Sequence, residues 1–137
     1  MAAAVADYSP VEAVPEKIAK TDAPMTLTLQ RTPDILADLS QLSNRRPTPL
    51  VLVGFAAETG DLLRKARDKR ARKNVDLIVA NDVTTPGAGF EVETNAVTII
   101  GVDEEQTLPL QSKARVAEAI LDRVEQVLKT RTAAVKR

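Results

Sequence analysis

The basic run from Arg64 to Lys73 contains the residues best suited to bind a ligand. Seven of its ten residues are basic and one, Asp68, is acidic, which gives a local charge of +6. Lys65, Lys69 and Lys73 recur every four residues and would form one stripe along a helix. Each like-charged pair at this spacing destabilises a helix by about 0.2–0.5 kcal/mol unless an anion lies between the charges. The stripe is therefore either a solvated helix face or a clamp for phosphate groups.

Four further residues could contact such an anion or the base attached to it. Phe55 follows an apolar run and a glycine, so it is either a core residue or a ring that packs beside a base. Lys17 and Lys20 lie in a proline-containing stretch, as surface lysines or as a lid over a triphosphate. Asp7 follows a run of small residues, where it could bind a base or sugar or cap the next turn.

The composition excludes several kinds of chemistry. The chain has no histidine and no cysteine, which removes Ser-His triads, thiolate nucleophiles and His- or Cys-ligated metals. Its 19 basic and 19 acidic residues balance, and only three residues are aromatic, which disfavours nucleic-acid binding. No apolar run is long enough to span a membrane, and no signal peptide is recognisable. We therefore expect a cytoplasmic protein that uses carboxylates, lysines, backbone amides or a bound divalent cation.

These residues must be positioned by alternating strands and helices. Hydrophobic patterning predicts helices that start at Thr32, Thr59 and Ser112, and strands at 25–30, 50–53, 75–80 and 96–100, together with a buried strand that ends at Asp7. Residues 8–23 and 84–91 are predicted to be loops and 103–107 an acidic turn. This order predicts an α/β fold with a mostly parallel, Rossmann-like sheet and helices on both faces. The carboxyl ends of the strands would then gather Asp7, residues 54–59 and residues 81–82.

The known phosphate-binding fingerprints are absent from the sequence. Gly87-Ala88-Gly89 lacks the third glycine and the following helix of a dinucleotide site, so an oxidoreductase has little support. No Walker A sequence occurs either. Any glycine-rich phosphate loop must come from another polypeptide segment.

Several longer motifs occur in a characteristic order. They are AAVADY (3–8), PEKI (15–18), TPDIL (32–36), VGFAAET (53–59), ARDKRARKNVDLIVANDV (66–83), GFEVETNAVTII (89–100) and LPLQSKARVAEAILDRV (108–124). Together they resemble the motifs of the bacterial phosphopantothenate–cysteine ligases, also called phosphopantothenoylcysteine synthetases. In many bacteria this ligase is the C-terminal half of a bifunctional coenzyme A biosynthesis protein.

The resemblance implies a ligase of pantothenate metabolism that uses CTP with Mg²⁺ or Mn²⁺. The carboxylate of 4′-phosphopantothenate would attack the α-phosphate to give an acyl-cytidylate and pyrophosphate, and the amine of L-cysteine would then displace CMP. No flavin is expected in this chain. The implied CTP contacts are Asp7, Lys17, Pro33, Asp34, Ile35, Leu36, Phe55, Lys69 and Lys73. Lys17 would be the lysine of the lid, important for activity through its charge.

The resemblance also implies that the chain depends on a partner. It covers residues 1–128 as the C-terminal portion of a ligase domain, and residues 129–137 are expected to be a disordered basic tail. The family's glycine-rich phosphate loop and its flavin-dependent decarboxylase domain are not in this sequence. We therefore expect a homodimer, or association with an N-terminal ligase or decarboxylase part. The alternative is a non-catalytic nucleotide- or anion-binding module, a remnant of the ligase.

Overall fold

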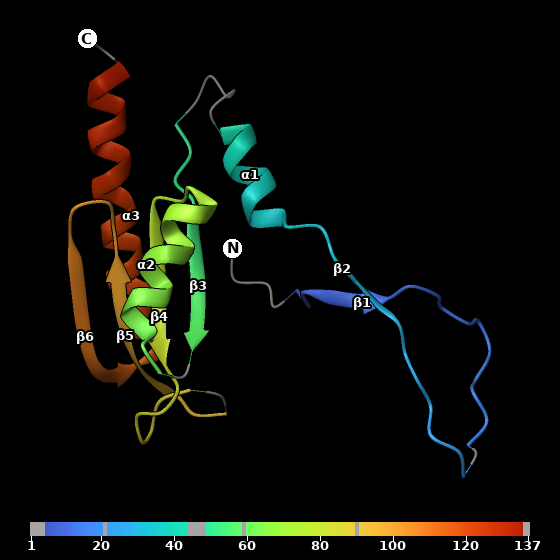
Figure 1. Cartoon of the computed structure of the whole chain (residues 1–137). Coiled ribbons are helices and arrows are strands. Elements are labelled where there is room, and N and C mark those ends of the chain that lie inside the picture. The colour runs from blue at the N-terminus through green and yellow to red at the C-terminus, as the bar shows by residue number, and fades with distance from the viewer. Residues whose placement is uncertain (1–4, 21, 44–48, 59, 90, 136–137) are drawn as a thin grey trace. The chain divides into compact units, whose positions relative to one another are not determined.

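A computed structural model describes residues 5–20, 22–43, 49–58, 60–89 and 91–135 (Figure 1). The chain divides into two compact units, which we describe separately. The smaller unit is Ala3–Ile35, and the larger one is built from Leu36–Arg137.

The smaller unit is organised by one short pair of strands. Strand β1 (Tyr8–Pro10) pairs antiparallel with β2 (Leu29–Arg31). The hydroxyl of Thr32 donates to the carbonyl of Ala6 over 2.6 Å, which closes the base of this pair. The predictions for this region were largely wrong, because residues 25–28 form no strand, the predicted loop contains β1, and residues 5–7 are exposed and irregular. Residues 1–4 of the predicted first strand lie outside the described residues.

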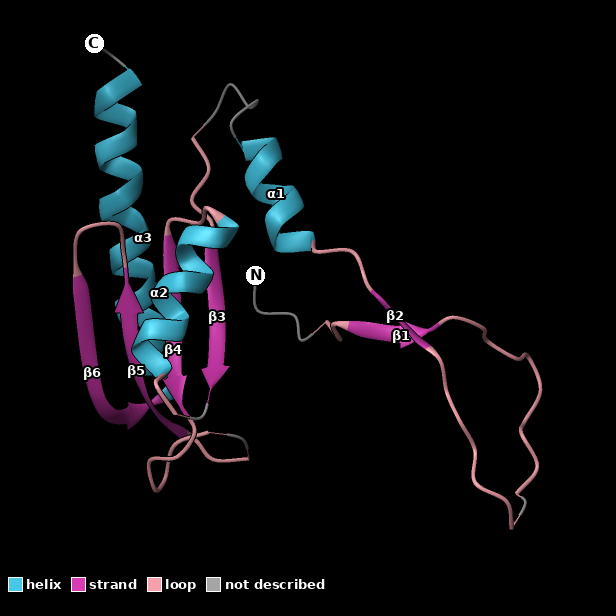
Figure 2. Cartoon of the chain, in the orientation of Figure 1, coloured by secondary structure: helices cyan, strands magenta, loops and turns pink. Residues whose placement is uncertain are grey.

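The larger unit is a four-stranded sheet in the order β3-β4-β5-β6 (Figure 2). Its strands are β3 (Val53–Glu58), β4 (Leu77–Asp82), β5 (Thr94–Ile100) and β6 (Glu105–Ser112). Strands β3 and β4 are parallel, whereas β4–β5 and β5–β6 are antiparallel. The α/β class is confirmed, but within the described sheet only one of the three strand pairs is parallel, so the expectation of a mostly parallel sheet was wrong.

Strand β6 replaces the acidic turn predicted at 103–107. The turn is shorter and earlier, since the amide of Gly101 donates to the carbonyl of Glu104 over 2.8 Å. Beyond it, β6 pairs along β5, and the hydroxyls of Thr98 and Thr107 lie 3.2 Å apart across the two strands. Pro109 and the polar residues of β6 give no clear strand pattern in the sequence, but an edge strand tolerates both.

Helices cover both faces of the sheet, as predicted. Helices α1 (Ile35–Ser43) and α2 (Leu62–Lys73) contribute to one apolar cluster, and α3 (Lys113–Val135) contributes to the other. Alternate residues of β4 point to opposite faces, so Ile78 belongs to the first cluster and Val79 to the second. Of the residues predicted to face inward from the basic helix, Ala66 is buried and Leu62 half-buried, but Leu63 is exposed.

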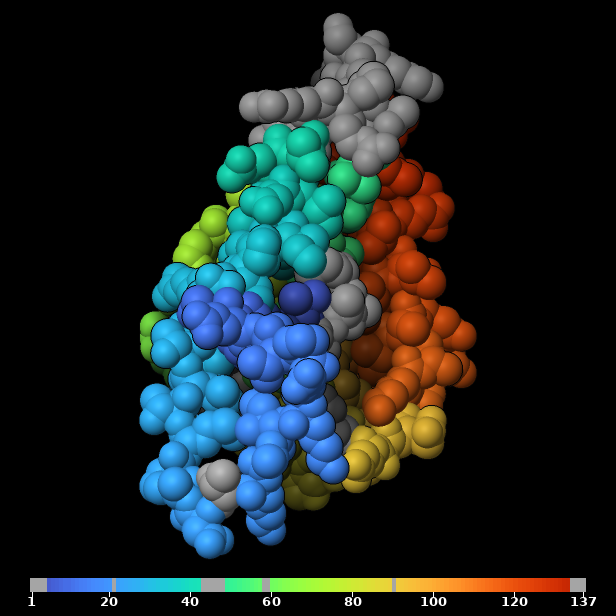
Figure 3. Space-filling view, turned by 90° about the vertical axis from the view of Figure 1, so that its right-hand side faces the viewer, coloured from blue at the N-terminus to red at the C-terminus, as the bar shows by residue number. Residues whose placement is uncertain are grey.

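Helix α3 begins as predicted, with the hydroxyl of Ser112 accepting a hydrogen bond from the amide of Arg115 over 3.3 Å. Where the sequence favoured a frayed tail from residue 129, α3 continues to Val135. Arg131 explains part of this continuation, because its guanidinium binds the carbonyl of Leu50 and the carboxylate of Asp76. In the space-filling view, α3 forms the orange and red side of the larger unit (Figure 3).

Candidate functional site

The carboxyl ends of β3 and β4 lie side by side, as the sequence predicted. Glu58 is opposite Asp82, and Ala57 is opposite Asn81. After β3 the chain turns through Gly60 and Asp61, whose φ angles are 65° and 48°, and α2 then starts at Leu62. Because α2 joins two parallel strands, it runs back from the carboxyl end of the sheet toward the amino end.

The basic helix lies against β3 through one of its lysines. Lys69 donates a hydrogen bond of 2.9 Å from Nζ to the backbone carbonyl of Phe55. A shallow hollow of about 200 Å³ on the same helix is lined by Lys65, Asp68, Lys69 and Arg72. Lys73 ends the helix, about 12 Å along the axis from Lys65 at 1.5 Å per residue. The lysine stripe therefore starts near the carboxyl edge and extends away from it, rather than lying wholly at that edge.

Two arginines of α2, Arg64 and Arg67, are paired with carboxylates. Arg64 contacts both Asp61 and Asp68, and Arg67 forms a two-pronged pair with Glu105 of β6, with Nη2 lying 2.7 Å from Oε2. The hydrogen bond from Arg67 lowers the pKa of Glu105, and the same bond raises the pKa of Arg67. The hydrogen bond to Asp61 raises the pKa of Arg64.

The partner of Lys69, like that of Arg70, is a backbone carbonyl and carries no charge, in contrast to the carboxylates bound by Arg64 and Arg67. The Phe55 carbonyl is a dipole, whereas Asp61, Asp68 and Glu105 are anions that cancel the charge of the cation they bind. The ammonium of Lys69 therefore keeps its full positive charge beside β3. This charge, with that of the exposed Arg72, is available to an anionic ligand.

Polar groups also gather at the end of β4. The carboxylate of Asp82 accepts hydrogen bonds from the hydroxyl of Thr84 at 2.6 Å, the amide of Thr84 at 2.9 Å and the hydroxyl of Thr85 at 3.0 Å. The Thr84 hydroxyl is the main cause of a lowered pKa for Asp82. Beside it, the side-chain oxygen of Asn81 is buried and accepts no hydrogen bond from the described residues.

The structure brings together only some of the residues that the sequence singled out. Phe55 and Lys69 are in contact, Phe55 is 42% exposed, and Lys73 is on the same helix. Leu36 is buried in the cluster beneath β3, which makes it a core residue of the larger unit. The remaining predicted residues belong to the smaller unit, which is described by itself: Asp7, Lys17, Pro33, Asp34 and Ile35.

Glu105 was missed because it fell in the predicted turn. Its pairing with Arg67 joins residues 38 apart in the sequence and depends on the position of β6. A charged residue in an apparent turn carries no signal of such a contact. The strand alternation of Gln106, Leu108 and Leu110 was the only available hint.

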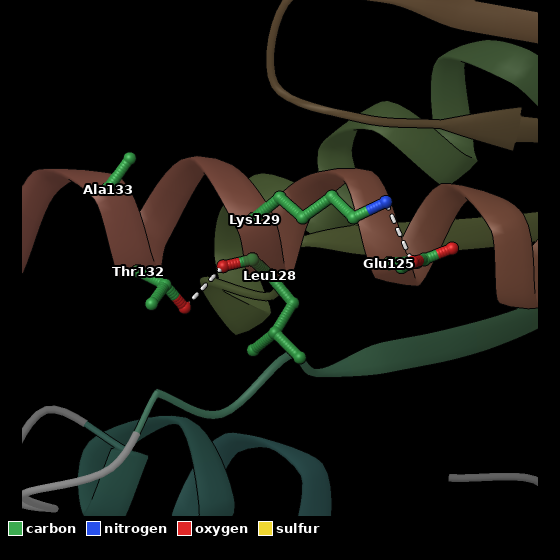
Figure 4. A pocket seen from close by; sticks show the side chains of 5 residues that line it. All are labelled: Glu125, Leu128, Lys129, Thr132 and Ala133. Atoms are coloured by element: carbon green, nitrogen blue, oxygen red, sulfur yellow. Dashed lines mark hydrogen bonds and ion pairs between the residues drawn. The ribbon is translucent and has the colours of Figure 1, made fainter.

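A second hollow, of about 520 Å³, runs beside the C-terminal half of α3 and is lined by Glu125, Leu128, Lys129, Thr132 and Ala133 (Figure 4). Its polar groups are already engaged within the helix. Lys129 pairs with Glu125 at 2.7 Å, and the hydroxyl of Thr132 donates to the carbonyl of Leu128 over 2.9 Å. With no converging polar groups left to orient a ligand, it is a weaker candidate than the surface of α2.

The described residues offer neither a preformed metal site nor a helix that could span a membrane. Among the described residues, no group of three or more acidic side chains is placed to hold a metal ion. In the same part of the chain, no helix has the length and apolarity that crossing a bilayer requires.

Comparison with known proteins identifies the family. Residues 1–128 match the model of the DNA/pantothenate metabolism flavoprotein C-terminal domain. The chain is 48% identical over 123 residues to the coenzyme A biosynthesis bifunctional protein CoaBC of Bacillus subtilis (strain 168), covering 89% of this chain and 29% of that protein. It is 42% identical over 125 residues to the CoaBC of Escherichia coli (strain K12), and the match covers 89% of this chain and 30% of that protein. The chain thus spans less than a third of the length of these relatives.

Solved structures agree with this assignment. The crystal structure of the C-terminal domain of CoaBC matches with a TM-score of 0.61 and 40% identity, over 74% of this chain and 48% of that one. The DNA/pantothenate metabolism flavoprotein from Streptococcus pneumoniae matches with a TM-score of 0.66 and 24% identity, over 90% and 60% of the two chains, and this likeness supports the fold. The chain belongs to the DNA/pantothenate metabolism flavoprotein C-terminal domain family.

Proposed function

We propose that this chain is the nucleotide-binding portion of a ligase that joins 4′-phosphopantothenate to L-cysteine at the expense of CTP. The relatives are named for coenzyme A biosynthesis, and the chain shares over 40% identity with them. The observation that carries the proposal is the uncancelled charge of Lys69 on a lysine-striped helix that starts at the carboxyl ends of two parallel strands. That is where α/β proteins bind ligands, and a triphosphate is the ligand that this charge suits.

In this proposal α2 binds the polyphosphate of CTP. Lys69 and Lys73 contribute positive charge, and the half-exposed ring of Phe55 packs beside the base or the ribose. Charge on the leaving group rises as the α-phosphate is attacked, so a nearby ammonium stabilises the transition state more than the ground state. The carboxylate of 4′-phosphopantothenate displaces pyrophosphate, and the cysteine amine then displaces CMP and loses a proton.

Residues of the smaller unit would complete the nucleotide site. Lys17, exposed between β1 and β2, is the proposed lid lysine, and its charge would act on the departing pyrophosphate. The backbone of Pro33–Leu36 at the start of α1 offers hydrogen-bonding groups to the base. Asp7 is proposed to accept a hydrogen bond from the base or sugar.

A divalent cation would be held mainly by the nucleotide. The described residues supply no cluster of three carboxylates, and the Asp82 carboxylate already accepts three hydrogen bonds. Mg²⁺ commonly binds through substrate phosphates, with one or two protein carboxylates and water. The cation would supply charge neutralisation at the phosphates, and the chain fits that role without a protein cage.

The test is turnover in the presence of the rest of the ligase. We expect CMP and pyrophosphate to appear when the chain is combined with CTP, Mg²⁺, 4′-phosphopantothenate, cysteine and the part of the Bacillus subtilis relative outside the matched region. Lys17→Met should abolish turnover, whereas Lys129→Met on α3 should leave it unchanged. CMP release by the 137-residue chain alone would contradict the dependence on a partner. Tight CTP binding with no turnover under any of these conditions would indicate the non-catalytic module instead.

A further inference from the structure

The shallow hollow on α2 is lined by three cations and one anion. Its volume is about 200 Å³, and its lining residues are Lys65, Asp68, Lys69 and Arg72. A carboxylate among cations can cancel the charge of only the cation that it binds. How strongly the hollow attracts an anion therefore depends on which basic residue Asp68 is paired with.

Asp68 has an arginine one helical turn away on each side. Arg64 precedes it by four residues and Arg72 follows it by four, so both are spaced to pair with it along the helix. In the structure Asp68 binds Arg64, with Oδ2 lying 3.3 Å from Nη1. Asp61 also binds Arg64, through Nε, so this one guanidinium is held between two carboxylates.

Arg72 is the arginine that this arrangement leaves with its charge uncancelled. Its side chain is exposed, and no carboxylate of the described residues pairs with it. Lys69 precedes it by three residues, about 4.5 Å along the helix axis, and donates to the neutral carbonyl of Phe55. Like charges at this spacing destabilise a helix unless an anion lies between them. The pair is thus suited to bind one extended anion together.

The position of Arg72 along α2 indicates which end of a nucleotide it would contact. The helix starts at the carboxyl ends of β3 and β4 and runs away from them, and Arg72 is in its last turn. The second substrate must reach the α-phosphate, which places that phosphate toward the open carboxyl edge, where α/β proteins bind ligands. A polyphosphate extended along the hollow from that edge brings its last phosphate to Arg72.

We propose that Arg72 binds the terminal phosphate of the nucleoside triphosphate, and that Arg64 is a positioning residue that keeps Asp68 from neutralising Arg72. This inference rests on the proposed function and extends it, because Arg72 then distinguishes a triphosphate from a diphosphate. An arginine presents parallel N–H donors to two phosphate oxygens, whereas a lysine acts as a point charge. After the cytidylyl group is transferred, the same guanidinium contacts the pyrophosphate that leaves.

Calorimetric titrations of the chain with CTP and with CDP, each with Mg²⁺, test the role of Arg72. Arg72→Gln should weaken CTP binding about tenfold, through the loss of a charge-assisted contact with phosphate, and should leave CDP binding unchanged. Arg115→Gln is the control, because Arg115 is an exposed arginine of α3, and it should bind both nucleotides like the wild type. Equal CTP affinity for Arg72→Gln and the wild type would overturn the proposal, as would equal losses for CTP and CDP.

The positioning role of Arg64 predicts an effect from a residue outside the hollow. Arg64→Gln releases Asp68 to pair with Arg72, so CTP binding should weaken about twofold while CDP binding stays the same. Asp68→Asn should strengthen CTP binding by a similar factor. The double variant Arg64→Gln/Asp68→Asn has the net charge of the wild type and should recover its affinity. If Arg64→Gln weakens CTP and CDP binding alike, the effect is one of general charge, which contradicts the positioning role.

Further measurements separate the possible sources of phosphate. 4′-Phosphopantothenate also ends in a phosphate, and if Arg72→Gln weakens its binding but not that of CTP, the hollow belongs to the other substrate and the proposal is wrong. Circular dichroism checks that each variant folds, and the gain expected for Asp68→Asn cannot arise from misfolding. An unchanged CTP affinity in Arg72→Gln would leave the proposed function intact, whereas no CTP binding by the wild type would overturn both.

Discussion

Lys69 of α2 donates a hydrogen bond of 2.9 Å to the backbone carbonyl of Phe55, on the side of β3 that faces away from β4. This contact connects the basic helix to the strand beside which a nucleotide would bind. It also shows how a lysine can be held in place by a neutral group without losing its charge. Arg64 and Arg67 of the same helix instead bind carboxylates, whose charge cancels theirs.

Asp76 joins three segments of the larger unit, and its loss should destabilise the fold. Its side chain is 11% exposed; one oxygen accepts from the amide of Leu52 at 2.7 Å, and the other binds Arg131 of α3. Asp76→Ala leaves a buried amide without an acceptor, so the free energy of unfolding should fall by about 1–3 kcal/mol. Urea denaturation checks this. Arg131→Ala should have a smaller effect, and equal stability of Asp76→Ala and the wild type would contradict the bonding described.

Gly54 is placed where no side chain fits, so Gly54→Ala should also destabilise the protein. An added Cβ would lie 2.7 Å from Cδ1 of Ile78 and 2.9 Å from Cδ2 of Leu36. Relief requires the buried side chains of Ile78 and Leu36 to shift or to change rotamer within the packed core, at a cost of about 1–3 kcal/mol. Thermal unfolding measures the change. Ala57→Ser, an exposed substitution on the same strand, should shift the midpoint little, and a similar shift for both variants would count against the packing.

The pair of Arg67 and Glu105 predicts a specific pH dependence of stability. Arg67 lowers the pKa of Glu105 in the folded chain, so the carboxylate stabilises the fold above its ordinary pKa and loses this effect as the pH falls through the lowered value. The urea midpoint of Glu105→Gln should be below that of the wild type at pH 7, and the two should converge at an acid pH below the lowered pKa of Glu105. Glu118→Gln, which removes an exposed partner 3.8 Å from Arg115, serves as the control. A constant gap at both pH values would refute the linkage.

The sequence allowed the β3–α2–β4 unit to be predicted because its apolar pattern is local. The predicted strand began at Leu50, whereas β3 starts at Val53 and continues through the small residues Gly54 and Ala56. Gly54 is required by close packing against Leu36 and Ile78, which a local sequence pattern cannot show. Strand β6 was missed for the same kind of reason, as its pairing with β5 outweighs an unfavourable Pro109. Tertiary context decided both cases.

The candidate site, like the fold, could be predicted from the sequence only in part. The lysine stripe follows from spacing alone, and its place on α2 is confirmed. The acceptor of Lys69, by contrast, is a backbone carbonyl 14 residues away, which leaves no trace in residue types. The contact between Arg67 and Glu105 required β6, and the outward direction of the Phe55 carbonyl required the strand register. The pattern of charged residues could be read from the sequence. The hydrogen-bond partners of individual cations, a backbone carbonyl for Lys69 and a carboxylate for Arg67, could not.

The central claim is that α2 binds the triphosphate of CTP through Lys69. Calorimetric titration of the chain with CTP and Mg²⁺ tests it most directly, with Lys69→Met compared with Lys129→Met, a lysine of α3 that pairs with Glu125. We expect Lys69→Met to weaken binding about tenfold, the loss of one charge-assisted hydrogen bond to phosphate, and Lys129→Met to bind like the wild type. Equal CTP affinity for Lys69→Met and the wild type would contradict the account.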